Sequence, residues 1–498
     1  MTSSSTKTIF TSALLVMVGK VISSSSVILE RSILGQYTSV SQYGKIAVAI
    51  AIFQFSLVFS VFGLEQTVAK YTPHEQATSW KQNIWITGMV ISLIISSLSV
   101  LFQLALYPIY DQYLPMISLE PFILMMVSVP FVSGLRVSVG AARGINNASY
   151  RTIAQDTIYP GLRVGLLYIS FIFGLGILGI GVSYFVSAIV GIVTIILFLR
   201  TDYRRFRDIE IKLAELLRYS APVMLSTFIV VILNKFDVLM ISYFVNSTEV
   251  GLYEAAFPLA YGIVVLSSSF GYSLLPITSS LQESKKDVNE IYKTTIKWMY
   301  IVSIPVFIIQ FSFSSDVLRI IFTNSYTPAA PMLKVLSAGF LVNAAFGRNR
   351  EILTAIGDIH PVLLINVFAV ISNIIMNIFL IPILGGLGAS IASVTTYTLI
   401  NVISEIHLRR KHNLTAIYRE NLLFEMKHSI LLAGFFVPLS YVIGLNIISL
   451  FLVSFIAASL SVILALYIGE INDHDREIIR DVESRLGLKN GSVTAWFE

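Results

Sequence analysis

Lysine and arginine side chains lie within long apolar stretches of this sequence, where a charge needs a specific reason. Lys20 belongs to the first such stretch, Arg31 lies just beyond its end, and Arg163 and Lys235 belong to two later stretches. An ionisable group inside the hydrocarbon core of a bilayer is costly and by default marks a functional site. We therefore predict that Lys20, Arg31, Arg163 and Lys235 form a cationic cavity that binds an anionic group.

The spacing of Lys20 and Arg31 favours a shared cavity-lining face. The two residues are eleven positions apart, which on a helix returns to within about 20° of the same face, and Ser23 and Ser24 fall between them on that side. The alternative is that Arg31 extends to the outer headgroups while Lys20 pairs with a carbonyl of a neighbouring helix. Arg163 likewise either extends to the inner surface or meets an anionic headgroup entering from there.

Acidic residues in the same stretches are candidates for ion coupling. Asp237 follows Lys235 by two positions, about 200° around a helix, so one lines the cavity and the other pairs elsewhere. Lys235 is the better candidate for the cavity. Asp237 either binds a proton or cation or serves as a structural partner, and Glu30 is a second coupling candidate. An excess of cations over acids favours a lipid-linked phosphate, which lysine and arginine bind through charge-assisted hydrogen bonds.

The amino-acid composition is typical of a protein embedded in a lipid membrane. Only 13% of the 498 residues are charged, about half the ~25% usual in soluble domains, and the mean hydropathy is +0.78. This excludes a soluble enzyme, a disordered chain and a nucleic-acid partner. Runs of roughly 20 apolar residues occur fourteen times, at 8–30, 44–66, 84–107, 121–140, 157–174, 179–199, 219–245, 252–275, 298–315, 330–347, 360–384, 386–406, 429–446 and 449–468.

The runs predict an all-α polytopic membrane protein with about 14 transmembrane helices. They are too long, and lack the two-residue alternation, for a membrane barrel. With the N-terminus inside, 26 of the 34 Lys and Arg residues fall in cytoplasmic segments, which by the positive-inside rule puts both termini in the cytoplasm. We expect a multi-pass protein of the cell (plasma) membrane.

A repeat in the sequence suggests two similar halves. Glu30 lies 14 residues before Gly44, and Asp237 lies 14 residues before Gly251. We predict an N-terminal six-helix lobe at 1–200, a C-terminal six-helix lobe at 201–410, an additional helix pair at 411–469 and a cytoplasmic amphipathic tail at 470–498. Parallel repeats of this kind are a known transporter plan.

Motifs for enzymatic chemistry are missing. Cysteine is absent, and the sequence has no G-x-x-x-x-G-K-[ST] or H-E-x-x-H pattern. His407 and His412 are assigned to a basic inner loop, so we expect no metal site and no cofactor. A membrane glycan ligase or polymerase would need a sizeable outer loop with carboxylates or histidines. The outer loops are short, and we expect no enzyme.

Several stretches resemble the polysaccharide (lipid-linked oligosaccharide) flippases of the multidrug, oligosaccharidyl-lipid and polysaccharide exporter superfamily. The first half has Arg31-Ser-Ile-Leu34-Gly35 and Tyr43-Gly44, and the second has Pro222, Asp237 and Gly251-Leu252-Tyr253 with Ala256. Further matching positions are Leu275-Pro276, Phe322, Tyr326 and Ala330, and the run from Asn373 through Asn377, Leu380-Ile381-Pro382 and Gly386 to Ala392.

The resemblance covers about residues 8–410 and implies a MATE-type transporter fold that works by alternating access. It implies flipping of a polyprenyl-phosphate- or diphosphate-linked oligosaccharide from the inner to the outer leaflet, for surface polysaccharide or glycoprotein glycan assembly. Implied partners are that glycolipid, membrane lipids and glycan-assembly enzymes. The alternative is a cation-coupled multidrug exporter of the same superfamily, with Asp237, Glu30 or Glu254 as its coupling site. The peptidoglycan-precursor flippases use several cavity arginines, so the partly lysine set here favours another lipid-linked glycan.

Overall fold

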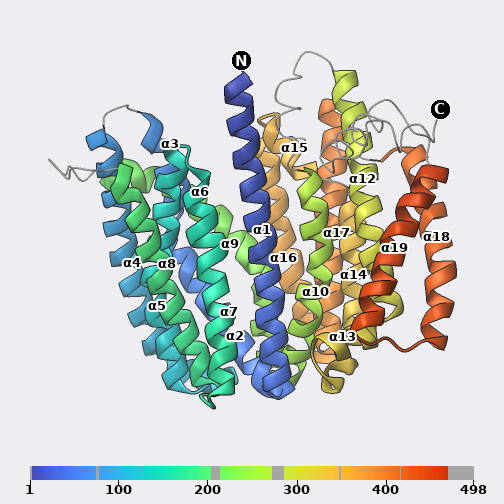
Figure 1. Ribbon diagram of the computed structural model, residues 1–498, viewed down its shortest axis with the longest axis horizontal. Coiled ribbons are helices and arrows are strands. Elements are labelled where there is room, and N and C mark those ends of the chain that lie inside the picture. The colour runs from blue at the N-terminus through green and yellow to red at the C-terminus, as the bar shows by residue number, and fades with distance from the viewer. Residues whose placement is uncertain are drawn as a thin grey trace. The chain divides into compact units, whose positions relative to one another are not determined.

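The computed structural model describes residues 3–74, 78–202, 213–271, 285–346, 349–415 and 417–468 (Figure 1). Every regular element within these ranges is helical. Inside lipid every backbone polar group must find its partner within the protein, and a helix meets this need within a single segment, so long apolar runs fold as helices. The predicted all-α fold is therefore confirmed for the described ranges. The predicted tail at 470–498 lies outside them.

The chain forms two compact units. The first unit comprises Met1–Ala255 with Ile375–Ala389, and the second comprises Ala256–Ile374 with Ser390–Glu498. The predicted lobes at 1–200 and 201–410 and the helix pair at 411–469 stay predictions.

Helices that belong wholly to the first unit run from the N-terminus to Phe244. They are α1 (Ser3–Tyr37), α2 (Val40–Val61), α3 (Leu64–Tyr71), η1 (Thr72–His74), α4 (Thr78–Tyr113), α5 (Leu119–Gly144), α6 (Ala148–Arg151), η2 (Thr152–Ile158), α7 (Tyr159–Ile172), α8 (Leu178–Asp202) and α9 (Leu213–Phe244). Residues of α10 (Ser247–Gly271), α16 (Ile359–Leu384) and α17 (Gly386–His407) belong to both units.

The second unit is built from the later helices. They are α12 (Lys285–Ser312), α13 (Ser314–Ile321), η3 (Asn324–Ala329), α14 (Ala330–Ala345), α15 (Asn349–Ala355), η4 (Leu408–His412), α18 (Arg419–Val442) and α19 (Ile447–Ile468). Helix α12 packs against α14, α18 and α19 (Figure 1).

Twelve helices in the described ranges are long and apolar enough to cross a membrane, so the protein is a multi-pass membrane protein. Two of the fourteen predicted spans are not among these twelve. The run at 8–30 lies in α1, which is 35 residues long, and the run at 157–174 coincides with the 14-residue α7. The number fourteen stays a prediction, as does the cytoplasmic location of the termini.

Close helix packing in the first unit depends on small residues. Helix α5 lies along α8 and α4 (Figure 1), and Leu135 and Ile195 are fully buried in the core between these helices. A Cβ atom on Gly134 of α5 would come within 2.6 Å of Ile192 Cδ1 on α8. In lipid, helix association relies on such close packing because the hydrophobic effect does not drive apolar helices together there.

A reciprocal glycine contact joins α2 to the start of α10. A Cβ atom on Gly44 would overlap the carbonyl oxygen of Ser247, and a Cβ atom on Gly251 would overlap the carbonyl oxygen of Val40. The hydroxyls of Ser41 and Ser247 lie 2.7 Å apart in the same contact. The two glycines of the repeat in the sequence thus occupy matching places in one backbone-to-backbone contact.

The boundary predicted between the runs at 360–384 and 386–406 is confirmed. Helix α16 ends at Leu384 and α17 begins at Gly386, and between them Gly385 adopts a φ of +58°, a conformation that favours glycine. The backbone N–H of Gly386 donates to Glu249 Oε2 at 2.9 Å. An acid at the first turn of a helix also complements the helix dipole.

Candidate functional site

The C-terminal part of α1 places two opposite charges next to each other. Glu30 and Arg31 are buried, with exposed fractions of 2% and 5%. Consecutive helical residues point about 100° apart, so the two side chains meet different partners. Those partners lie on α7, α8 and α10, and α9 joins the same buried network through Glu254.

Glu30 is held by α7 and α8. Its Oε2 accepts a 2.6 Å ion pair from Arg163 Nη2, and its Oε1 accepts a 2.8 Å hydrogen bond from the hydroxyl of Tyr184. The Arg163 guanidinium also lies 4.8 Å from the Tyr184 ring centre and 5.2 Å from that of Tyr159. Stacking on aromatic faces is a geometry that guanidinium favours. Glu30 is therefore the counter-ion of Arg163 in this structure.

Glu254 on α10 receives the other two cations. Its Oε1 lies 2.7 Å from Lys235 Nζ, and its Oε2 lies 3.7 Å from Arg31 Nη2. The hydroxyl of Tyr43 donates to the backbone oxygen of Glu254 at 3.1 Å. Glu254 thus brings together α1 and α9, and with them two of the four predicted cations.

Asp237 accepts hydrogen bonds from two neutral side chains. It is fully buried. Its Oδ2 accepts a 2.8 Å hydrogen bond from the Tyr253 hydroxyl, and its Oδ1 accepts a 2.6 Å bond from Asn377 Nδ2. Lys235 and Asp237 project differently from α9, as their spacing predicts, yet they reach the adjacent residues Glu254 and Tyr253 of α10.

The ion pairs of this network involve more cations than carboxylates. When all groups are ionised, Arg31, Arg163 and Lys235 meet the two carboxylates of Glu30 and Glu254. Among the described residues, neither Nε nor Nη1 of Arg31 has a hydrogen-bond partner, and neither does Nε of Arg163. A buried donor without an acceptor costs about 1–3 kcal/mol, and more when it is charged. Arg31 thus retains donors that an anion can fill.

Lys20 lies apart from this network. Its side chain is exposed, and none of the ion pairs within the described ranges includes it. The neighbouring Gly19 packs against Thr152 and Asp156 of η2, and Asp156 pairs with Arg151 at 3.3 Å. At 1.5 Å per residue, Lys20 and Arg31 are separated by about 16 Å along α1. Its place in the cationic cavity stays a prediction.

Sequence reasoning alone did not find the tyrosines. Tyr43 and Tyr253 appeared only within the motifs of the family resemblance, as did Asn377, and Tyr184 had no sequence signal. The surplus of cations over acids is also smaller than the sequence suggested, since Glu30, Glu254 and Asp237 are all buried beside the cations. Charge spacing in the sequence gives no information about which helices become neighbours.

Comparisons with known proteins place the chain in a family. The family described as "Polysaccharide biosynthesis protein" matches residues 33–331, which is more than half of the 498 residues. The chain belongs to this family. The membership confirms the family resemblance drawn from the sequence motifs.

A curated relative and two solved structures extend the comparison. A protein of Haloferax volcanii named probable flippase AglR is 27% identical over 172 residues, or 34% of this chain and 36% of that protein. The lipid II flippase MurJ in an inward closed conformation has a TM-score of 0.73 at 12% identity, covering 95% of this chain and 100% of that one.

The second solved structure is an inward-facing MATE-family multidrug resistance transporter of the MOP superfamily. It has a TM-score of 0.67 at 15% identity and covers 79% of this chain and 97% of that one. At such low identities both structures speak to the fold alone. The predicted relation to the MATE-type transporter fold is confirmed.

Proposed function

We propose that this protein is a flippase. It moves an oligosaccharide linked to a polyprenyl phosphate or diphosphate from the inner to the outer leaflet by alternating access. The product serves surface polysaccharide or glycoprotein glycan assembly. The observation that carries the proposal is the buried, incompletely hydrogen-bonded guanidinium of Arg31 within a network whose ion pairs join three cations to two carboxylates.

Phosphate chemistry suits the open donors of this network. Guanidinium groups bind phosphate through parallel, charge-assisted N–H···O bonds, which are about twice as strong as neutral ones. Burial away from water strengthens such bonds because few competing waters remain. In the proposed cycle a phosphate oxygen takes the free positions of Arg31, and Lys235 shifts its ion pair from Glu254 towards the ligand.

The comparisons support the same assignment. AglR is named a probable flippase and MurJ a lipid II flippase, and the family is named for polysaccharide biosynthesis. The chain then acts as a carrier rather than as an enzyme, which disfavours a ligase or polymerase. Its partners are membrane lipids and glycan-assembly enzymes, and it resides in the plasma membrane with both termini cytoplasmic.

The experiment is a flipping assay in vesicles. The purified chain is reconstituted with a fluorescent polyprenyl-diphosphate oligosaccharide, and an added glycosidase removes the sugars it can reach. We expect nearly all of the glycolipid to become accessible with protein and only the outer-leaflet portion without it. Equal accessibility in the two preparations, with the reconstituted protein still folded, would contradict the proposal.

Lys20 provides a test that leaves the ion-pair network intact. Its side chain is exposed, so Lys20→Gln should leave the thermal stability in detergent unchanged. We expect the flipping rate to fall about threefold to tenfold, the effect of losing one partly solvated charge contact. Arg319→Gln, which removes a cation paired with Asp316 in the second unit, is the control. A Lys20→Gln rate equal to the wild-type rate would remove Lys20 from the proposed path.

A second function, cation-coupled multidrug export, is favoured by one observation. Asp237 is a fully buried acid held by neutral donors, Tyr253 and Asn377, as a proton- or cation-binding carboxylate would be. Under the flippase proposal Asp237→Asn keeps one of the two accepted hydrogen bonds and lowers glycolipid flipping by less than about threefold. Two results together would favour the exporter. The wild type would export a cationic dye in a proton-driven way without flipping glycolipid, and Asp237→Asn would lose that dye export.

A further inference from the structure

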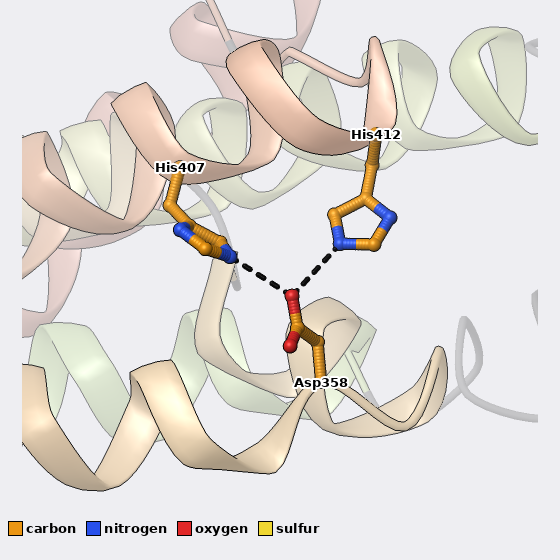
Figure 2. A group of neighbouring side chains, drawn as sticks. All are labelled: Asp358, His407 and His412. Atoms are coloured by element: carbon orange, nitrogen blue, oxygen red, sulfur yellow. Dashed lines mark hydrogen bonds and ion pairs between the residues drawn. The ribbon is translucent and has the colours of Figure 1, made fainter.

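A carboxylate and two imidazoles converge in the second unit, away from the ionic network. His407 Nε2 and His412 Nε2 lie 2.8 Å and 2.9 Å from the same oxygen, Oδ2 of Asp358. Figure 2 shows both rings directed at that oxygen from one side. One ligand atom from each residue lies within 4.8 Å of the other two. All three residues are partly buried.

A π-helical turn brings the two histidines together, which corrects their assignment to a loop. His407 is the last residue of α17 and His412 the last of η4, which continues the helix as a π turn. In an α-helix, residues five apart diverge by about 140°, whereas the wider π turn rotates them towards one face. Single π turns recur at functional sites.

A helix end sets the position of Asp358. Gly357 adopts a φ of +83° after the end of α15, and the backbone N–H of Asp358 donates to the carbonyl of Leu353 at 2.8 Å. The backbone thus turns sharply and presents the Asp358 side chain towards the end of α17. Nothing else in this short turn is charged.

The Asp358 carboxylate also contacts one lysine. Hydrogen bonds from His412, Lys411 and His407 hold the pKa of the Asp358 carboxyl below its usual range. Lys411 Nζ lies 2.9 Å from both carboxylate oxygens, but its side chain is 55% exposed. A flexible, solvated ammonium can leave the carboxylate at little cost.

We propose that Asp358, His407 and His412 form a binding site for a divalent transition-metal ion of the zinc class. Zinc takes imidazole nitrogen and carboxylate oxygen at about 2.0–2.2 Å, so tetrahedral donors lie about 3.3 Å apart. The two measured N–O distances fall short of that separation by about half an ångström. Small side-chain rotations therefore open a space of the required size at the point where the three donors meet.

The types of ligand atom limit which metal ions the site would prefer. Two imidazoles and one carboxylate suit zinc and its first-row neighbours, whereas calcium and magnesium prefer oxygen ligands alone. Three protein ligands leave a fourth position for water. A bound ion would join the turn between α15 and α16 to the end of α17. Metal binding is thus expected to stabilise this end of the second unit.

The test uses the purified full-length protein, freed of any histidine tag and treated with a chelator. Zn²⁺ alone, added in the micromolar range, should raise the melting temperature and bind in a one-to-one ratio. Co²⁺ alone should give the visible absorption of a four-coordinate site. His407→Gln and Asp358→Asn should each weaken Zn²⁺ binding by at least about tenfold.

Two variants serve as controls. His360→Gln removes an exposed histidine near Asp358 that is not one of the three ligands, and should bind Zn²⁺ as the wild type does. Lys411→Ala removes the competing ammonium and should bind Zn²⁺ equally or more tightly. The proposal is wrong if wild-type protein gives no saturable Zn²⁺ binding and no Co²⁺ spectrum. It is also wrong if His407→Gln and Asp358→Asn bind Zn²⁺ as tightly as His360→Gln.

Discussion

Replacing Arg31 with glutamine is expected to lower glycolipid flipping in vesicles by about tenfold or more, because a hydrogen bond to a charged group contributes about 1.5–3 kcal/mol. Arg31 has open buried donors, and glutamine can neither neutralise a phosphate nor form two parallel bonds to it. The partner Glu254 keeps its 2.7 Å ion pair with Lys235. The rate of sugar exposure at saturating glycolipid measures the effect.

Two further variants separate charge from folding. Arg31→Lys retains the charge and should restore part of the rate, though not all of it, because an ammonium lacks the planar fork of guanidinium. Arg319→Gln, a cation of the second unit, should flip at the wild-type rate. If Arg31→Gln is well folded and flips as fast as the wild type, the anion does not bind at Arg31.

Replacing Gly44 with alanine is expected to destabilise the protein by about 3 kcal/mol or more, at the upper end of overpacking effects. The new methyl group would overlap the backbone oxygen of Ser247, and a backbone atom inside a helix cannot rotate away as a side chain can. The usual gain of about 1 kcal/mol from Gly to Ala in a helix is too small to offset this. Thermal unfolding in detergent measures the loss.

Gly434→Ala is the matched control for Gly44→Ala. Gly434 lies within α18, and a Cβ atom there would meet nothing within 4 Å. We expect it to leave the melting temperature unchanged or to raise it slightly. Equal melting temperatures for Gly44→Ala and Gly434→Ala would show that α2 and α10 do not approach each other through their backbones.

Much of the secondary structure could be predicted from the sequence because each element depends on local properties. The lengths of the apolar runs predicted most of the helices, and the boundary between the runs at 360–384 and 386–406 predicted the break at Gly385. The short α7 was harder: the run at 157–174 reads as one span, yet its first residues belong to the π turn η2. The local amino-acid composition does not indicate where a helix changes from π-helical to α-helical geometry.

The sequence predicted most of the charged residues of the candidate site, but it did not predict which of them form ion pairs with each other. Burial of a charge in an apolar run identified Arg31, Arg163 and Lys235, and the helical angle separated Lys235 from Asp237. The counter-ions depend on which helices pack together, so Glu254 as the partner of both Lys235 and Arg31 required the structure. The same holds for Asp358, which lies 49 residues from His407.

The most direct test of the central claim is whether the buried network recognises the phosphate group of its lipid. The measurement is the melting temperature of the purified protein with a polyprenyl-diphosphate oligosaccharide and with the same oligosaccharide on an uncharged polyprenyl ether. We predict that the charged glycolipid raises the melting temperature of the wild type but not of Arg31→Gln, and that the uncharged one raises neither. An equal rise with both lipids, retained in Arg31→Gln, would contradict the proposed anion site.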